Sequence, residues 1–358
     1  MAKNVELREL SLKDVLMRNE ISAKNKYLVE ANPFVSSTDS VGMICGFVNE
    51  DEAGHMYVFP TKLMINDVEC SAIAGSDFIV DKKFRKYGLG MMIPERLVEL
   101  SDYVILGNVS DMARPVYEYC GFHFFDIPKY LCVLNSRLFL GRYLSGCLLE
   151  AIGWGADLFL KFNKLVYDIY IKSRLRKFTV LEKTLKNARI DEVCRIMQNG
   201  SHKYTELHNE EWLRWVIGYR SDTNSSQSLY EVEYRGKLQG FFIIKRQKIK
   251  KMGFTRYKKP LNNLVWKELI EWGLVENSIV SEGQLYALIL SNIKCSCDVV
   301  QMASLNSSSL SLIPKIVMQK YGCSNFAIFK KGLTNTDSPD LFNIQNWRVR
   351  TGVGDNFI

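Results

Sequence analysis

A basic turn that contains two glycines constrains this chain more than any other stretch. The residues before it, Ala72–Val80, are mostly apolar and β-favouring, which predicts a strand. The residues after it, Met91–Leu100, predict a helix with one apolar side. The turn reads Arg85-Lys86-Tyr87-Gly88-Leu89-Gly90. Such a turn can bind an anion, because the first N–H groups of a helix lack intrahelical partners and the helix dipole favours negative charge there.

Three known phosphate-binding patterns use a turn of this kind. The P-loop pattern, Gly-x4-Gly-Lys-Ser/Thr, is absent, and the dinucleotide fingerprint needs a third glycine where this chain has Ile93. The stretch from Val80 to Gly90 resembles the pyrophosphate-binding motif of the GNAT superfamily of acyl-CoA N-acyltransferases. That motif is Arg/Gln-x-x-Gly-x-Gly/Ala after a strand that ends in Val, and Lys82 stands where the family often has Pro.

A second motif follows at the spacing that the family shows. It matches the segment Asn-x-x-Ala-x-x-x-Tyr-x-x-x-Gly-Phe at Ala113, Tyr117, Gly121 and Phe122, with Ser110 where Asn is usual. A short apolar strand, residues 103–106, precedes it. The resemblance covers residues 32–134.

The resemblance implies a site for acetyl-CoA or coenzyme A as co-substrate. The main chain near Phe78 and Val80 would hydrogen-bond the pantetheine in a gap between two splayed parallel strands. The pyrophosphate would lie on the turn and the start of the helix, and Ser110 would also bind the cofactor. The residues of the turn that the resemblance assigns to this site are Arg85, Lys86, Tyr87, Gly88, Leu89, Gly90 and Met91.

The catalytic residues are less defined by sequence. In the family, the tyrosine at the position of Tyr117 lies near the departing sulfur and can protonate the thiolate. An amine acceptor must also lose a proton, for which a carboxylate or a bound water would serve. Glu52, Glu69 and Asp77 are the candidates, and Asp77 is preferred because it lies on the strand expected to line the cleft. A surface role for Asp77 and a core role for Tyr117 are the alternatives.

The length of 358 residues predicts more than one domain. We expect an α/β (α+β) chain of tandem GNAT-like domains, each with a mixed, mostly antiparallel sheet flanked by helices. The expected divisions are an acyltransferase domain over 1–135, a helical connector over 136–177, and a degenerate GNAT-like domain over 178–358. The second domain lacks Arg-x-x-Gly-x-Gly, and an unrelated α/β domain is the alternative. Within it, residues 285–290 predict a strand and residues 310–321 a helix.

Charge is distributed unevenly. Residues 1–135 contain 14 Lys/Arg and 19 Asp/Glu, whereas residues 136–358 contain 33 and 20. The basic half, including eight Lys/Arg over residues 245–259, suggests an anionic partner, although a solvated lysine-rich surface is equally compatible. The connector predicts either a packed helix or an interfacial amphipathic helix in weak contact with a membrane surface. No recognised nucleic-acid-binding fold accompanies the basic half, so nucleic acid is not the expected partner.

The remaining composition bears on compartment and chemistry. Nine cysteines without framework spacing indicate reduced thiols and a cytoplasmic protein, and the N-terminus lacks an apolar signal core. Four histidines have no metal-ligand spacing, so no metal is expected. The segment from Trp347 to Asp355 resembles the tails of GNAT-like proteins from polysaccharide-synthesis loci.

The resemblance therefore implies an acyl-CoA-dependent N-acyltransferase. Its acceptor would be an amine of a small molecule or of an envelope or polysaccharide precursor, which attacks the thioester directly. Two alternatives stay open: a non-catalytic binding protein with the GNAT fold, and a Fem-type transferase that uses aminoacyl-tRNA. The oligomeric state and the acyl chain length do not follow from the sequence.

Overall fold

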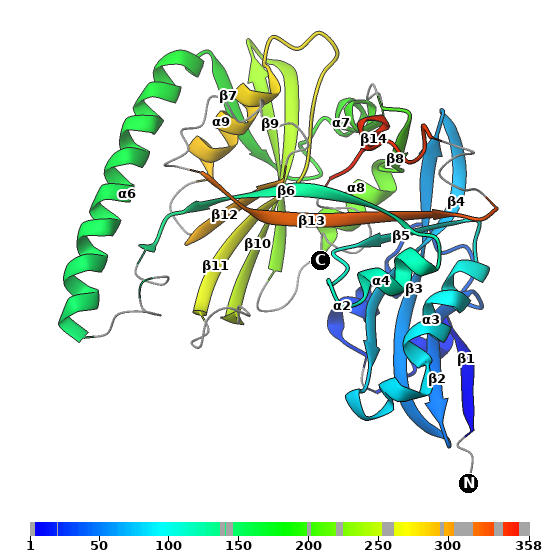
Figure 1. Ribbon diagram of the computed structural model, residues 1–358. Coiled ribbons are helices and arrows are strands. Elements are labelled where there is room, and N and C mark those ends of the chain that lie inside the picture. The colour runs from blue at the N-terminus through cyan, green and yellow to red at the C-terminus, as the bar shows by residue number, and fades with distance from the viewer. Residues whose placement is uncertain are drawn as a thin grey trace. The chain divides into compact units, whose positions relative to one another are not determined.

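The computed structural model divides the chain into two compact units (Figure 1). Unit 1 contains residues 1–127, 200–215 and 324–358, and unit 2 contains residues 128–199 and 216–323. The structure describes residues 4–19, 21–136, 140, 146–198, 202–219, 225–252, 261–293, 297–303, 318–332 and 339–350. Residues 253–260, 304–317 and 351–358 lie outside this set. They include part of the basic segment, most of the predicted helix over 310–321, and the tail from residue 351.

Unit 1 is built on a mixed, mostly antiparallel sheet in the order β1-β2-β3-β4-β5-β13. The β4–β5 pair is parallel, and the other neighbours run antiparallel. The short strand β8 pairs with β3 and β14. The strands are β1 (Val5–Ser11), β2 (Val41–Val48), β3 (Asp51–Ile65), β4 (Val68–Val80), β5 (Tyr103–Gly107), β8 (Tyr204–Glu206), β13 (Gln319–Lys330) and β14 (Trp347–Arg348).

Helices cover both faces of this sheet. Helix α3 (Leu89–Glu99) and helix α4 (Arg114–Tyr119) bury Ile93, Leu97 and Tyr117 against apolar side chains of β2 to β5. Helix α2 (Ala23–Glu30) contacts β3 and buries Leu28 and Val29. The short helix α1 (Leu12–Leu16) begins at a capping box made by Ser11 and Asp14. Residues 5–11, which precede α1, form the strand β1 because they pair with β2.

Unit 2 repeats this pattern of strand pairing. Its sheet has the order β6-β12-β11-β10-β9-β7, with one parallel pair, β11 and β12. The hairpin between β9 and β10 closes through Arg235 and Gly236, which both have positive φ as a two-residue turn requires. The strands are β6 (His123–Val133), β7 (Phe178–Lys183), β9 (Ser225–Tyr234), β10 (Lys237–Met252), β11 (Leu261–Leu274) and β12 (Val299–Ala303).

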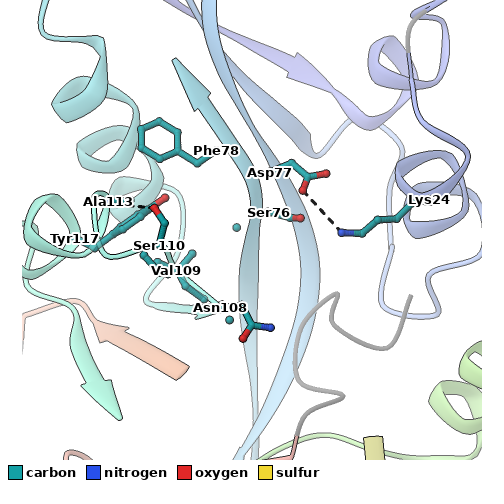
Figure 2. A pocket seen from close by; sticks show the side chains of 12 residues that line it. Lys24, Ser76, Asp77, Phe78, Asn108, Val109, Ser110, Ala113 and Tyr117 are labelled. Atoms are coloured by element: carbon teal, nitrogen blue, oxygen red, sulfur yellow. Dashed lines mark hydrogen bonds and ion pairs between the residues drawn. The ribbon is translucent and has the colours of Figure 1, made fainter. Parts of the chain in front are cut away.

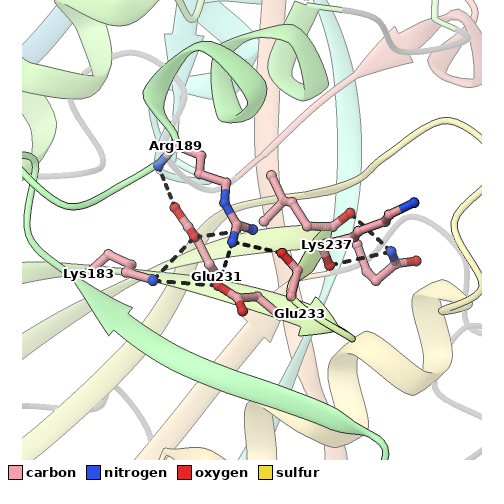
Figure 3. A network of polar contacts seen from close by, with 8 residues as sticks. Lys183, Arg189, Glu231, Glu233 and Lys237 are labelled. Atoms are coloured by element: carbon pink, nitrogen blue, oxygen red, sulfur yellow. Dashed lines mark hydrogen bonds and ion pairs between the residues drawn. The ribbon is translucent and has the colours of Figure 1, made fainter.

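Among the residues that the structure describes, unit 2 contains helices α6 (Gly146–Leu175), α7 (Ile190–Gln198) and α9 (Glu282–Asn292). Residues 285–290, predicted as a strand, are part of α9, because burial on all sides removed the helical periodicity from this stretch. A network of ion pairs joins β7 and β9 to the start of α7 (Figure 3). In it, Arg189 and Lys183 contact the fully buried Glu231 and the neighbouring Glu233.

The units differ from the expected domains because they are not consecutive in sequence. Residues 200–215 and 324–358 were assigned to the second domain but belong to unit 1. The chain leaves unit 1 within β6, re-enters it over residues 200–215, and returns a second time within β13, whose residues 326–330 pair with β5. The expected fold class, mixed and mostly antiparallel sheets flanked by helices, is confirmed. A degenerate GNAT-like second domain stays a prediction, which the repeated pairing order supports.

Candidate active site

The site lies where the parallel strands β4 and β5 separate. Their pairing ends at Gly75 and Leu106, although β4 continues to Val80 and β5 to Gly107. The gap contains a cavity of about 300 Å³. Its lining comes from both strands, the loop after β5 and helix α4. The splayed strands expected from the resemblance are therefore present, and the β5-facing backbone edge of β4 beyond Gly75 is available to an extended ligand.

An irregularity in β4 turns its side chains at this point. Tyr57 pairs with Ser76 and His55 with Ile79, so β4 has one extra residue against β3. Asp77 has a φ of 50°, which marks a β-bulge. Figure 2 shows the result: Asp77 extends toward Lys24 on one side of β4, whereas Phe78 lies on the side of Tyr117 and Ser110. The bulge thus places the Asp77 and Phe78 side chains on opposite sides of β4.

The turn after β4 has the geometry of an anion site. A 3-10 helix over Lys82–Tyr87 leads to Gly88, which caps α3 with a φ of 82°. The N–H groups of Met91 and Met92 bond to the Gly88 carbonyl. Those of Leu89 and Gly90 come earlier in the helix, where no intrahelical carbonyl is available. A Cβ added at Gly88 or Gly90 would meet nothing within 4 Å, so ligand atoms can approach the backbone there.

Arg85 joins this turn to the gap. Its Nε donates to the Val80 carbonyl at 3.2 Å, and its guanidinium contacts the Met112 sulfur at 3.6 Å. Arg85 and Gly90 line a second cavity of about 360 Å³. This cavity shares Phe78, Ser110 and Ala113 with the first. One continuous lining thus runs from the bulge in β4 to the basic turn.

Tyr117 is buried beside the bulge, with 2% of its surface exposed, and it lines the first cavity. Its ring stands edge-on to Phe78 and Phe122, at centroid distances of 5.9 and 5.3 Å. Its hydroxyl contacts the Met56 sulfur at 3.4 Å. Burial raises the pKa of Tyr117 well above its usual value, so the phenol holds its proton more tightly than an exposed tyrosine does.

Asp77 lies on the other side of β4, beside two residues of the first turn of α2. Its carboxylate accepts a hydrogen bond from Asn25 Nδ2 at 3.1 Å and lies 3.8 Å from the Lys24 ammonium. Asn25 is 3% exposed, and its Oδ1 has no hydrogen-bond partner among the described residues. Asn25 lines neither cavity, so its part in the site is to hold the Asp77 carboxylate.

The two other candidate bases have different surroundings. Glu52 contacts Arg18 at 2.8 Å and His55 at 3.0 Å, and these three line a separate polar cavity of about 230 Å³. Glu69 forms an ion pair with Lys62 and lies outside the cavities described above. The structure therefore brings only Asp77 into the gap between β4 and β5.

The predicted cofactor residues fall into two groups. Phe78, Val80, Arg85, Gly90 and Ser110 line the cavities together with the catalytic candidates Asp77 and Tyr117. The rest contribute to neither lining: Lys86, Tyr87, Gly88, Leu89 and Met91. The side chain of Leu89 is fully buried in the core, so only its backbone N–H can serve a ligand.

No pattern in the sequence indicated the residues that hold the loop after β5. Asn325 on β13 accepts from the Val109 N–H and donates to the Val109 carbonyl, both at 2.7 Å. Its own carbonyl accepts from the Asn108 N–H at 2.9 Å, and Ser324 bonds to the Asn108 side chain. These contacts join positions that are 216 residues apart, which no local pattern could predict. They fix the loop that carries Ser110 into both cavities.

Helix α9 is the counterpart of α3 in unit 2, because each helix connects the two parallel strands of its unit. The N-terminus of α9 is closed by a capping box between Ser281 and Gln284. Glu282 stands in the first turn and accepts from Tyr286 and Trp272. Side chains thus occupy the N–H groups of Ser281 and Gln284, and the Glu282 carboxylate would repel a phosphate.

In the part of the chain that the structure describes, no group of three or more His, Cys, Asp or Glu side chains could hold a metal ion. Among the helices described, none combines the length and apolar character needed to cross a membrane.

Comparison with known proteins identifies the fold. No family model matches the sequence, and no curated protein matches it. A GCN5-related N-acetyltransferase from Anabaena variabilis superposes with a TM-score of 0.52 at 10% identity, over 91% of this chain and 72% of that one. A probable N-acyltransferase from Enterococcus faecalis gives 0.53 at 11%, over 92% and 73%.

The N-myristoyltransferase of Saccharomyces cerevisiae, solved with bound myristoyl-CoA, gives a TM-score of 0.56 at 12% identity. The match covers 91% of this chain and 79% of that one. Each of these similarities extends over both units. The chain therefore has the fold of the GNAT N-acyltransferases.

Proposed function

We propose that this protein is an acyl-CoA-dependent N-acyltransferase. The observation that carries the proposal is the continuous lining from the gap between β4 and β5 to the basic turn at Arg85–Gly90. An acyl-CoA molecule needs such a path, because its thioester, pantetheine and pyrophosphate are arranged along one chain. The bound myristoyl-CoA of the yeast structures is in keeping with this assignment.

The two ends of the lining suit different parts of the co-substrate. The N–H groups of Leu89 and Gly90, with Arg85 nearby, would bind the pyrophosphate through the helix terminus. The β5-facing edge of β4 beyond Gly75 would hydrogen-bond the pantetheine amides as an added strand. Gly90 would be needed for pyrophosphate binding, because a Cβ at this position would occupy the open space where a phosphate would lie.

The acceptor amine would approach from the side of Asp77. Its nitrogen forms a bond to the thioester carbonyl carbon while the carbon–sulfur bond breaks. The nitrogen loses its proton to Asp77, directly or through water, and Tyr117 protonates the departing thiolate. Asn25 would hold the Asp77 carboxylate in position through its Nδ2 hydrogen bond. Holding both reactants in one cleft would supply much of the rate.

The acceptor is an amine of a small molecule or of an envelope or polysaccharide precursor, and acetyl is the proposed acyl group. A Fem-type transferase would bind aminoacyl-tRNA and would not need the turn. A binding protein with the same fold would bind CoA without turning it over. Tyr117 and Asp77, both in the lining of one cavity, favour an enzyme over a binding protein.

Calorimetric titration of acetyl-CoA and free CoA into the purified protein tests the proposal. We expect micromolar binding by the native chain and binding at least about tenfold weaker in Gly90→Glu, because a carboxylate would face the phosphates. Gly155→Glu is the matched control, since Gly155 also has open space at its Cβ but lies on α6. Its affinity should equal that of the native chain.

The outcomes separate the alternatives. If neither ligand binds the folded native chain, the acyltransferase assignment is wrong, and specific tRNA binding would then point to the Fem-type alternative. If CoA binds but no thiol is released from acetyl-CoA with any of a panel of amines, the binding-protein alternative is favoured. Equal losses in Gly90→Glu and Gly155→Glu would show that the turn is not the site.

A further inference from the structure

Helix α6 presents an apolar surface to solvent. One side of the helix is packed: Tyr167, Ile171 and Leu175 are buried in the core of unit 2 with residues of α9. Ten other large apolar side chains of α6 are each at least 40% exposed. We call these the α6 face: Leu148, Ile152, Trp154, Leu158, Phe159, Phe162, Leu165, Val166, Ile169 and Tyr170.

The α6 face lies opposite the packed side of the helix. At about 100° per residue, Phe162 is roughly 180° from the buried Ile171. The face extends from Leu148 to Tyr170, a length of about 33 Å at 1.5 Å per residue. Trp154 and Phe162 are each 62% exposed and Ile169 is 60% exposed. A contiguous apolar surface of this length on a folded protein marks an interaction site.

Charge on α6 is arranged around this face. Of the acidic side chains that the structure describes on the helix, Asp157 turns inward to accept two hydrogen bonds from Ser136, and Asp168 is half-buried. Basic side chains are exposed beside the face and at its C-terminal end: Lys161, Lys172, Arg174, Arg176 and Lys177. Arg174 also lies over the Tyr170 ring, at 4.9 Å from its centroid.

We propose that the α6 face binds the surface of an anionic lipid bilayer, with the helix axis parallel to the membrane. A helix with aromatic and aliphatic side chains on one face and Lys/Arg beside them has the chemistry of an interfacial helix. The basic C-terminal end is complementary to anionic headgroups. A second copy of the chain would instead oppose these positive charges with the same charges. The proposal is independent of the acyltransferase assignment.

Co-sedimentation with vesicles tests this inference. The native chain should bind vesicles of phosphatidylglycerol and phosphatidylcholine, and it should bind phosphatidylcholine alone weakly. Phe162→Glu should weaken binding by more than about tenfold, because it removes a membrane-inserted ring and adds a repelled charge. Ile279→Glu is the control: Ile279 is 48% exposed in unit 2 but lies off α6. Its binding should match that of the native chain.

A second variant tests the charge contribution. Lys172→Gln with Arg176→Gln should weaken vesicle binding by roughly fivefold for each charge removed. High salt should likewise weaken vesicle binding by the native chain. Failure of the folded native chain to bind anionic vesicles would overturn the proposal. So would equal losses in Phe162→Glu and Ile279→Glu. Sedimentation velocity completes the test: a dimer without vesicle binding, which Phe162→Glu converts to monomer, would assign the face to a second copy instead.

Discussion

Replacement of Asn325 by Ala should loosen the active-site loop without disturbing the core. The side chain makes two hydrogen bonds to the backbone of Val109, both at 2.7 Å. At about 1 kcal/mol for each, their loss should lower the free energy needed to open the loop by about 2 kcal/mol. The equilibrium constant for loop opening should then rise roughly 30-fold. The backbone hydrogen bond from Asn108 to the Asn325 carbonyl does not depend on the side chain and should persist.

Hydrogen–deuterium exchange followed by mass spectrometry measures this effect directly. A peptide over residues 107–112 should exchange faster in Asn325→Ala, and CoA affinity should fall, because Ser110 lies on the same loop. Asn292→Ala is the matched control, since Asn292 Nδ2 also makes two hydrogen bonds, but within α9 of unit 2. Unchanged exchange in the loop of Asn325→Ala would refute the idea that β13 holds the loop.

Burial and packing lead to four further predictions. Gly46→Val should destabilise unit 1 by about 1–3 kcal/mol in chemical denaturation, because a Cβ at Gly46 would lie 2.5 Å from Leu89 Cδ2; an unchanged midpoint would contradict this packing. Tyr117→Phe should keep the fold but reduce the rate of thiol release at least about 100-fold, if Tyr117 is the acid. Because burial raises the Tyr117 pKa, the unfolded chain releases this proton more readily, so the native chain should lose stability as pH rises above about 10, and Tyr117→Phe should lose less. Burial raises the pKa of the Cys45 thiol to about 11, so iodoacetamide at pH 8 should label the exposed Cys147 well before Cys45; peptide mapping that finds equal labelling would refute this.

Local patterns in the sequence predicted the part of the site that one continuous segment builds. The strand before the turn, the helix after it and the glycine at the cap depend on neighbouring residues, and β4, Gly88 and α3 follow them. The same reasoning failed for α9, because a helix buried on all sides has no amphipathic period to detect. It also missed β1, which is a strand because it pairs with β2.

The sequence by itself determined the motif at Arg85–Gly90, the tyrosine at position 117 and, through them, the fold. Only the tertiary structure decided which carboxylate enters the cleft. Asp77 lies at a bulge in β4 and is held by Asn25, and neither feature applies to Glu52 or Glu69. The tertiary structure also decided that β13, from the far end of the chain, holds the loop at Val109. Hydrogen bonds between segments that are 216 residues apart form only once both strands lie in one sheet, so no local pattern can encode them.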